Sequence, residues 1–286
     1  MAKKILIIGY GIMTKGIIKN LYQTNNYELL LYSRHVEYIE NVSLVDKDEL
    51  TGSICCAEFV ITCFSNYDDL ESFMKNILLP IKSIYGTTVI DLTTSRIDYV
   101  EKFKQCIESR KGYFVEAPVT GSKVGSESGQ LSIFLHMEEI LYSRKDLVQL
   151  LSSISKKIYY FENSTEPTKF KLIYNSWGAY LLYSIHLFNP TKFDFSKKSL
   201  EVAKSIVCND GWMSLVCNSK LDQINNQNFD DIHFRIEYMV KDLEYANFSV
   251  FDHKLKEVDY LLKEYKKAAL NNPGMDYTVI GKESDE

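Results

Sequence analysis

A short apolar segment at the start of the chain runs directly into a glycine turn and then into a helical pattern. Residues 3–8 (KKILII) precede Gly9 and Gly11, and residues 15–22 have helical spacing. Strand, tight turn and helix in this order form the local structure of dinucleotide-binding sites. This feature constrains the fold more than any other in the sequence, because it predicts a parallel sheet and a nucleotide site together.

Each position of the turn has a physical role in such a site. Gly9 permits the tight turn, and Gly11 lets the backbone approach a pyrophosphate because it has no Cβ atom. The amides of Ile12 and Met13, at the start of the helix, point at the anion, and the helix dipole favours it. Thr14 stands where the fingerprint has a third glycine. The alternative interpretation is an ordinary loop after a buried strand.

The first half of the chain alternates short apolar segments with helical patterns. The further predicted strands are residues 28–32, 59–64, 88–91, 113–116 and 131–135. Strands that are apolar throughout and separated by helices favour a parallel sheet covered on both faces. After residue 163 the strand pattern ends and helical patterns follow. We therefore predict an α/β chain with a Rossmann-type dinucleotide-binding domain at residues 1–163 and an all-α substrate and dimerisation domain at residues 164–286.

The first helix of the second domain, predicted over residues 168–188, is apolar on almost every face. A transmembrane span is the alternative, but polar residues such as Asn175 and Ser184 favour a helix buried within protein. One small helical domain cannot cover such a helix on all sides, so we predict a homodimer formed through the helical domain. The last dozen residues have the polar pattern of a frayed tail.

Charge and cysteine content limit the possible partners. The 286-residue chain has a formal net charge of -5 and no block of lysines or arginines, which argues against nucleic acid and membrane surfaces as partners. Its six cysteines form no C-x-x-C pair and no cluster with zinc spacing. We therefore expect no metal, a reduced cytoplasmic compartment and a small-molecule ligand.

The segment after the second predicted strand bears on the choice of nucleotide. An acidic residue at this place would accept hydrogen bonds from a free adenosine ribose, but Tyr32, Ser33 and Arg34 include none. A hydroxyl and a guanidinium can instead donate hydrogen bonds to a 2′-phosphate. The segment therefore favours NADP over NAD, and the alternative is a solvent-exposed loop arginine.

Lys171 and Asn175 lie four residues apart, on one face of the predicted long helix. Most isolated lysines are solvated or extend to the surface. Here the neighbouring residues 170–175 (FKLIYN) predict burial. A buried ammonium needs a partner or a shifted pKa, which is typical of functional sites.

Five motifs, in order along the whole chain, resemble those of the β-hydroxyacid dehydrogenase family. This family includes 3-hydroxyisobutyrate dehydrogenase, tartronate semialdehyde reductase and, more distantly, 6-phosphogluconate dehydrogenase, and imine reductases are its relatives. The matching segments are GYGIMT (9–14), DLTTS (91–95), EAPVTGS (116–122), KLIYN (171–175) and KDL (241–243). Thr14, Ser65, Ser122 and Tyr174 depart from the family pattern.

The resemblance implies an NADP-dependent oxidoreductase that transfers a hydride between nicotinamide and a small carbonyl or hydroxy substrate, with NADPH preferred over NADH. It implies that Lys171 is the general acid or base and that Asn175 holds the substrate. Thr120, Gly121 and Ser122 fall on the loop that binds the substrate carboxylate. The expected cofactor-binding residues are Gly9, Gly11, Ile12, Met13, Ser33, Arg34, Ser65, Thr94 and Lys241. Two alternatives remain open, namely an imine reductase on the same scaffold and a catalytically silent nucleotide-binding or interaction protein.

Overall fold

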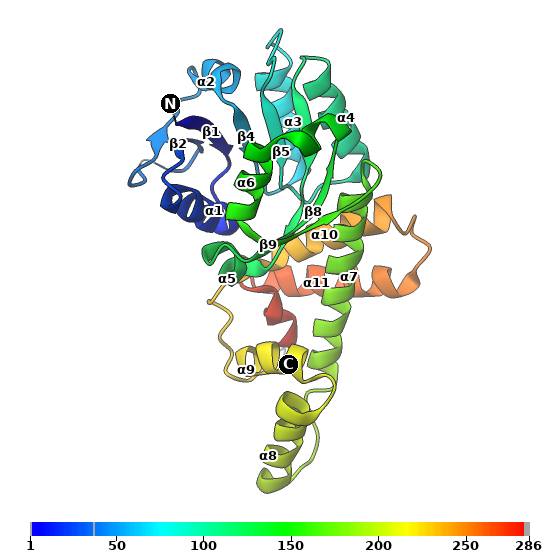
Figure 1. Cartoon of the computed structure of the whole chain (residues 1–286). Helices are drawn as coiled ribbons and strands as arrows, with labels where there is room; N and C mark the ends of the chain where they lie inside the picture. Colours follow the sequence, from blue (N-terminus) through cyan, green and yellow to red (C-terminus); the bar gives the residue numbers. More distant parts are fainter. Residues whose placement is uncertain (1, 37, 283–286) are drawn as a thin grey trace. The chain divides into compact units, whose positions relative to one another are not determined.

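The computed structural model describes residues 2–36 and 38–282 and divides into two compact units, Met1–Leu172 and Ile173–Glu286 (Figure 1). We call them the nucleotide unit and the helical unit. The division lies within one long helix, α7, which spans Glu166–Leu187. The sequence placed the boundary at residue 163, in the turn that precedes this helix.

The nucleotide unit is built on a nine-stranded sheet with the order β3-β2-β1-β4-β5-β6-β8-β7, and β9 pairs with β8. Helices and strands alternate along its chain, as the sequence predicts. The strands are β1 Lys3–Ile8, β2 Tyr27–Tyr32, β3 Ser43–Leu44, β4 Phe59–Thr62, β5 Thr88–Asp91, β6 Tyr113–Glu116, β7 Val119–Thr120, β8 Leu131–Met137 and β9 Ser155–Tyr160.

Successive residues of the central strands enter two different cores, one on each face of the sheet. Ile5 and Ile7 of β1 pack in a core with α1 and α6, whereas Leu6 and Ile8 pack in the opposite core with α2, α3 and α4. This alternation explains why the strands are apolar throughout rather than at every second residue. The helices are α1 Ile12–Gln23, α2 Leu50–Cys56, α3 Tyr67–Phe73, α4 Ile97–Glu108, α5 Ser122–Glu127 and α6 Lys145–Ser153. The predicted fold class, a Rossmann-type sheet followed by helices, is confirmed.

The sheet departs from the predicted parallel arrangement at β8. This strand runs antiparallel to β6 and to β7, and β9 then pairs with it in parallel. A parallel pair needs a crossover of a dozen or more residues, usually a long helix. Between β6 and β8 the chain forms the two-residue β7 and the short α5 rather than a long crossover helix, and β8 runs in the opposite direction.

The helical unit has its core where α7 meets the last helices of the chain. Its buried members include Ala179 and Leu182 of α7, Leu243 of α10 and Tyr265 of α11. The remaining helices of this unit are α8 Lys197–Ser205, α9 Ser214–Asn225, α10 Ile236–Ser249 and α11 Lys256–Asn271. No residue of α8 is buried within the single chain.

The long helix α7 is buried along one face and exposed along the other. Leu172 and Ala179 are fully buried, whereas Trp177 is 65% exposed and Phe188, directly after the helix, is 72% exposed. The apolar outer face therefore remains uncovered in the single chain. Among residues 2–36 and 38–282, no helix combines the length and the hydropathy needed to cross a membrane.

The segment after α11 does not form the predicted frayed tail. A 3-10 helix at Tyr277–Gly281 buries Val279 and Ile280 against the helical unit. The carboxylate of Asp276, which is fully buried, accepts hydrogen bonds from the backbone amides of His233, Phe234 and Thr278. Buried carboxylates persist when backbone amides satisfy them in this way, so Asp276 fixes the segment. Residues 283–286 of the predicted tail lie outside the described residues.

Candidate functional site

The parallel strands end at the same level of the sheet, and most of the predicted site residues come directly after these strand ends in the sequence. Tyr32, Ile8, Thr62, Asp91 and Glu116 are consecutive register partners across β2, β1, β4, β5 and β6. The next residues of each strand therefore leave the sheet along the same edge. In parallel sheets this is the edge at which ligands bind.

The glycine turn after β1 has the geometry that its sequence predicts. Gly9 has a φ of +99°, and a Cβ atom there would lie 2.4 Å from the carbonyl oxygen of Cys63. No side chain can occupy this position without moving the backbone directly after β4. At Gly11 a Cβ atom would meet nothing within 4 Å, so this backbone borders open space.

Thr14 performs a different task from the glycine that it replaces. Its hydroxyl accepts a hydrogen bond from the Gly11 amide at 2.7 Å and thereby stabilises the start of α1. The close contact lies at Gly16 instead, where a Cβ atom would lie 2.3 Å from Ser126 Oγ and 2.4 Å from the Ser126 backbone. Helix α1 therefore packs directly against α5.

The start of α1 fits a dinucleotide. Ile12 and Met13 are its first residues, and its first turn contains no acidic residue. The open space at Gly11 leaves room for a pyrophosphate at a helix N-terminus, where amides and the helix dipole favour an anion. The donor set and the space are those that a pyrophosphate requires.

Arg34 lies where the sequence places it, directly after β2, and its side chain is 63% exposed. Its guanidinium donates a hydrogen bond at 2.7 Å to Asp69 Oδ1 in the first turn of α3. A guanidinium has five N–H donors, so this ion pair leaves others for a phosphate. Ser33 is half-buried beside it, and its hydroxyl accepts from the His35 amide at 3.5 Å.

Ser65 and Thr94 follow β4 and β5 on the same edge of the sheet. Ser65 is exposed and Thr94 is half-buried. Between these strand ends, Asp91 accepts hydrogen bonds from the Thr62 hydroxyl at 2.8 Å and from the Thr93 amide at 3.1 Å. Burial raises the pKa of Asp91 to about 6, although these hydrogen bonds oppose the rise.

Glu116 connects the end of β6 to the start of α7. Its carboxylate is 1% exposed and accepts hydrogen bonds from the backbone amides of Thr165 and Thr168, at 2.7 and 2.9 Å. A negative charge at a helix N-terminus satisfies amides that have no partner within the helix. Burial raises the pKa of Glu116 despite these hydrogen bonds. The carboxylate therefore fixes the helix that carries Lys171 one turn further on.

The predicted substrate loop lies between β7 and α5. Thr120 is half-buried, whereas Gly121 and Ser122 are exposed. Gly121 has a φ of +137° and Ser122 a φ of +54°, so both have positive φ angles, which glycine adopts readily and serine uncommonly. The Gly121 carbonyl accepts a hydrogen bond from Gly125 at 2.8 Å and closes the first turn of α5.

Lys171 and Asn175 are both buried and share one face of α7. Their residues are 6% and 8% exposed. The Asn175 side-chain amide donates a hydrogen bond to Asp242 Oδ2 on α10 at 2.5 Å, and Asp242 is itself 1% exposed. Lys241, whose side chain is 14% exposed, places its ammonium 2.9 Å from the other carboxylate oxygen. The KDL segment thus forms a buried group with Asn175 inside the helical unit.

Within the described part of the chain, no group of three or more His, Cys, Asp or Glu side chains could hold a metal ion.

Residues 4–161 match the family of the NAD binding domain of 6-phosphogluconate dehydrogenase. The chain belongs to this family. The resemblance inferred from the five motifs is confirmed, and the nucleotide unit of this 6-phosphogluconate dehydrogenase-type chain is an NAD(P)-binding domain.

One relative aligns with most of this chain, but the aligned part is less than half of the relative's own length. The cytokine-like nuclear factor N-PAC of Homo sapiens is 26% identical over 251 residues, which are 85% of this chain and 44% of that protein. The chain therefore spans about half the length of the curated relatives that it matches first.

Solved structures share the fold over nearly the whole chain. Psf3 in complex with NADP+ and 2-OPP has a TM-score of 0.80 at 15% identity and covers 97% of this chain and 98% of its own. The 3-hydroxyisobutyrate dehydrogenase of Mycobacterium tuberculosis with L-serine has a TM-score of 0.78 at 18% identity and covers 98% of each chain. The imine reductase from Pseudomonas sp. has a TM-score of 0.57 at 15% identity and covers 99% of each chain.

Three acidic residues of this family member were missed as contributors to the site. Asp69 pairs with Arg34, Glu116 holds the start of α7, and Asp242 holds Asn175. Two of them carried a signal in the sequence. Glu116 ends an otherwise apolar strand, and Asp242 stands beside Lys241 in a largely apolar helix. Asp69 lies in the first turn of α3 beside Asp68, where acidic residues are common and no pattern distinguishes it.

Proposed function

We propose that this protein is an NADP-dependent oxidoreductase that transfers a hydride between nicotinamide and a small carbonyl or hydroxy substrate. The observation that carries this proposal is the burial of Lys171 and Asn175 on one face of α7, with Asn175 held by the carboxylate of Asp242. Buried titratable and polar side chains that are held in place by specific partners are typical of functional sites, which supports this role.

The chain's own residues supply the proton and the positioning. In the reducing direction, the Lys171 ammonium donates a hydrogen bond and then a proton to the oxygen that gains negative charge. Asn175 holds that oxygen in place, and the loop of Thr120, Gly121 and Ser122 anchors a carboxylate of the substrate. The bound cofactor supplies the hydride.

We propose NADP rather than NAD on the basis of Arg34 and Ser33. Arg34 is exposed at the sheet edge and retains N–H donors beyond the one that Asp69 accepts. No residue of the segment Tyr32–Arg34 is acidic. The binding of NADP+ by Psf3, which shares the fold, supports the same choice. Lysine at position 171 favours carbonyl over imine chemistry, because the imine reductases generally lack this lysine.

A second candidate is a nucleotide-binding protein without turnover. The name of the N-PAC relatives describes a nuclear factor rather than an enzyme. Thr14 and Tyr174 depart from the family pattern in the two motifs that matter most for cofactor and substrate. Such a protein would bind NADPH but would not oxidise it with any substrate, so binding and turnover measured together separate the two candidates.

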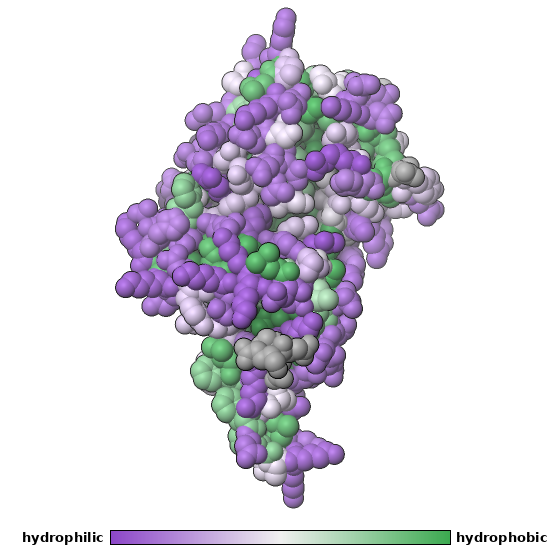
Figure 2. Space-filling view, turned by 180° about the vertical axis from the view of Figure 1, so that it is seen from behind, coloured by the Kyte–Doolittle hydropathy of each residue, from purple (hydrophilic) through white to green (hydrophobic). Residues whose placement is uncertain are grey.

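We propose that the helical unit forms a homodimer with a second copy of the chain. Apolar side chains gather at the surface of the end of this unit that carries α8, including Val202, Ile206, Trp212 and Leu215, of which Trp212 and Leu215 are 91% and 88% exposed (Figure 2). Exposed apolar surface of this kind marks association sites.

We propose the reducing cytoplasm as the compartment of this protein, because the cysteines of the described chain form no disulfide bonds.

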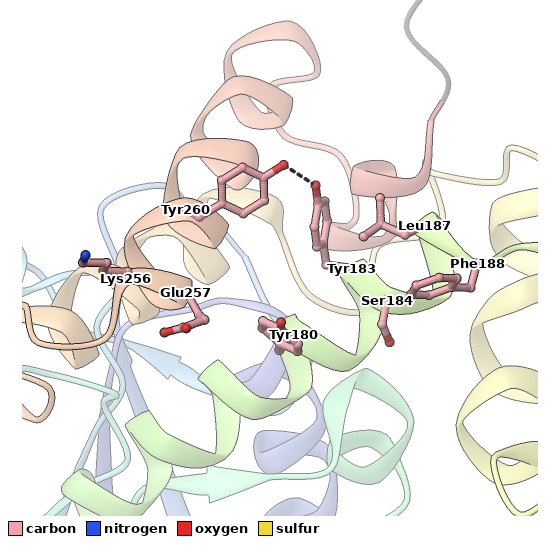
Figure 3. Close-up of a pocket in the computed structure, with 8 residues that line it drawn as sticks. All are labelled: Tyr180, Tyr183, Ser184, Leu187, Phe188, Lys256, Glu257 and Tyr260. Carbon is pink, nitrogen blue, oxygen red and sulfur yellow. Dashed lines mark hydrogen bonds between the residues drawn. The ribbon is translucent and has the colours of Figure 1, made fainter.

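A groove between α7 and α11 offers a second apolar surface in the same unit. It has a volume of about 370 Å³. Two residues of its lining, Tyr183 and Tyr260, form a hydrogen bond of 3.0 Å between their hydroxyls (Figure 3). Tyr180, Leu187 and Phe188 line it with exposed apolar area. We propose that apolar side chains of the second copy enter this groove.

The deciding experiment replaces the lysine. Lys171→Ala should lower kcat by at least ~100-fold, the scale of general acid catalysis, and leave the Kd for NADPH nearly unchanged. Lys171→Arg should not restore the rate, because a guanidinium keeps its proton. The matched control is Lys169→Ala, which removes an exposed lysine two residues earlier on α7. Stopped-flow NADPH oxidation with aldehydes, keto acids and cyclic imines measures the rates. A Lys171→Ala protein with normal turnover would contradict the proposal.

A further inference from the structure

Two segments leave the sheet on either side of the glycine turn, and an ion pair connects them. Strand β1 lies between β2 and β4, with Ile8 in register with Tyr32 on one side and with Thr62 on the other. Arg34 follows β2, and Asp69 lies in the first turn of α3, the helix that follows β4. Arg34 Nη2 donates a hydrogen bond to Asp69 Oδ1 at 2.7 Å. The Asp69 carboxylate is therefore held beside the segment that the sequence assigns to the adenosine ribose.

The start of α3 keeps Asp69 in this place. Asn66 caps the helix, and its side-chain oxygen accepts a hydrogen bond from the Asp69 backbone amide at 2.9 Å. A negative side chain in the first turn of a helix is also stabilised by the helix dipole. The side chain of Asp69 is 22% exposed, whereas that of Arg34 is 63% exposed. The carboxylate is thus the more enclosed member of the pair, and a phosphate that binds Arg34 comes close to it.

A carboxylate in this position acts on the two nucleotides in opposite ways. In NAD-binding sites an acidic residue accepts hydrogen bonds from the free ribose hydroxyls, and residues 32–34 include no acidic side chain. A carboxylate has about four lone-pair sites, so Asp69 can hold Arg34 and still accept from a hydroxyl. A 2′-phosphate, in contrast, carries negative charge that Asp69 repels, and it must share the guanidinium with this carboxylate.

We propose that Asp69 is a specificity-determining residue for the nucleotide, because it supplies the ribose acceptor that residues 32–34 lack and lowers the preference for NADP. This inference rests on the proposed function and extends it from the choice of one nucleotide to the binding of both. Arg34 favours the 2′-phosphate and Asp69 favours the free hydroxyl, so one ion pair carries both elements of recognition. The protein should therefore bind NADPH more tightly and still bind NADH.

The test removes the charge of Asp69 and keeps its shape. In Asp69→Asn we expect the Kd for NADPH to fall about fivefold, because the repulsion is removed. The Kd for NADH should rise about fivefold, because hydrogen bonds to an ionised acceptor are stronger than those to an amide. Fluorescence titration with both nucleotides measures the two constants. Asp68→Asn removes an exposed carboxylate from the same helix turn and should change neither constant.

Two further measurements separate this role from a general structural one. The gain for NADPH should shrink between about 0.05 and 0.5 M salt, because ions screen the repulsion between exposed charges. The loss for NADH should persist, since it comes from a hydrogen bond. The fragment 2′,5′-ADP should gain affinity as NADPH does, because it carries the 2′-phosphate without the nicotinamide. A fragment that gains nothing overturns the inference.

The ratio of the two dissociation constants decides the outcome. An equal change for both nucleotides in Asp69→Asn, which a local distortion of the site would produce, overturns the inference. A wild type that binds neither nucleotide overturns the proposed function. A wild type that binds both, while Asp69→Asn keeps their ratio, overturns only the role of Asp69.

Discussion

The two units differ in what holds most of their predicted site residues. In the nucleotide unit the predicted cofactor residues follow aligned strand ends, and Gly9 has a positive φ and no room for a Cβ atom. In the helical unit side chains hold the predicted site residues, as Asp242 does for Asn175. The nucleotide unit also buries its strands in two cores, whereas the helical unit leaves α8 without any buried residue.

This difference has a physical cause. A parallel sheet satisfies its own backbone and is covered on both faces by the helices that connect its strands. A helix satisfies its backbone alone and depends on neighbours only to cover its apolar face. The nucleotide unit thus covers its sheet within a single chain, whereas we propose that a second copy covers the apolar face of the helical unit. Three further experiments test this contrast.

The largest effect is expected from the buried carboxylate at the sheet edge. Burial raises the pKa of Asp91 from 3.8 to about 6, so the folded state favours the protonated form. Its stabilising contribution is complete below pH 3.8 and is lost as the pH rises through 6. Between pH 4 and 7 the wild type should lose about 3 kcal/mol of unfolding free energy relative to Asp91→Asn. Urea unfolding across this pH range measures it.

A matched control keeps that experiment specific. Asp68→Asn removes an exposed carboxylate from α3 and should follow the wild-type pH dependence. If the unfolding free energy of the wild type and of Asp91→Asn depended on pH in the same way, the buried Asp91 carboxylate would not be the cause. This outcome would contradict the role of the buried strand ends in the stability of the nucleotide unit.

The second effect concerns assembly of the helical unit. Leu215→Lys replaces an 88% exposed apolar side chain on α9, so the fold of one chain should tolerate it. If the second copy covers this face, the dimer Kd should rise about tenfold or more, because a charge must then be buried. Sedimentation velocity at micromolar concentration measures it. Asn218→Lys adds the same charge at an exposed polar position of α9 and serves as the control. A monomeric wild type would refute the contrast itself.

The smallest effect is expected at the ribose end of the nucleotide unit. Arg34→Asp should weaken NADPH binding about tenfold and leave NADH binding equal or improved, because an aspartate accepts from ribose hydroxyls and repels a phosphate. Fluorescence titration with both nucleotides measures the ratio. Lys47→Asp, an exposed charge reversal in another loop of the unit, should leave it unchanged. A wild type that prefers NADH would contradict the choice of NADP.

The part of the candidate site that depends on local backbone turns could be predicted from the sequence. The turn at Gly9 could be predicted, because glycine readily adopts the φ of +99° at this position and has no Cβ atom to meet the Cys63 carbonyl oxygen. Gly11 was predicted from the same motif, and its backbone borders open space. The burial of Lys171 and Asn175 followed from their apolar neighbours on α7. The antiparallel β8 did not follow, because a short apolar strand has the same composition in either direction.

Contacts between distant residues could not be predicted. Asn175 and Asp242 are 67 positions apart, and Arg34 and Asp69 are 35 apart, so no local pattern reports either pair. The ordered segment at Tyr277–Gly281 shows the same limit. Its sequence is typical of a tail, but the burial of Val279 and Ile280 and hydrogen bonds from amides more than 40 positions earlier to Asp276 order it.

The close contact at Gly16 places a constraint on how this protein can evolve or be redesigned. Ser126 Oγ donates a hydrogen bond to the Met13 carbonyl at 2.5 Å, and the side chain of Asn20 donates one to the Ser126 carbonyl at 2.7 Å. Two hydrogen bonds therefore connect α1 and α5. Helix α1 begins at the glycine turn and α5 begins at Ser122. Any residue larger than glycine at position 16 displaces both starts at once. A substitution at position 16 would therefore disturb the predicted nucleotide loop and the predicted substrate loop together.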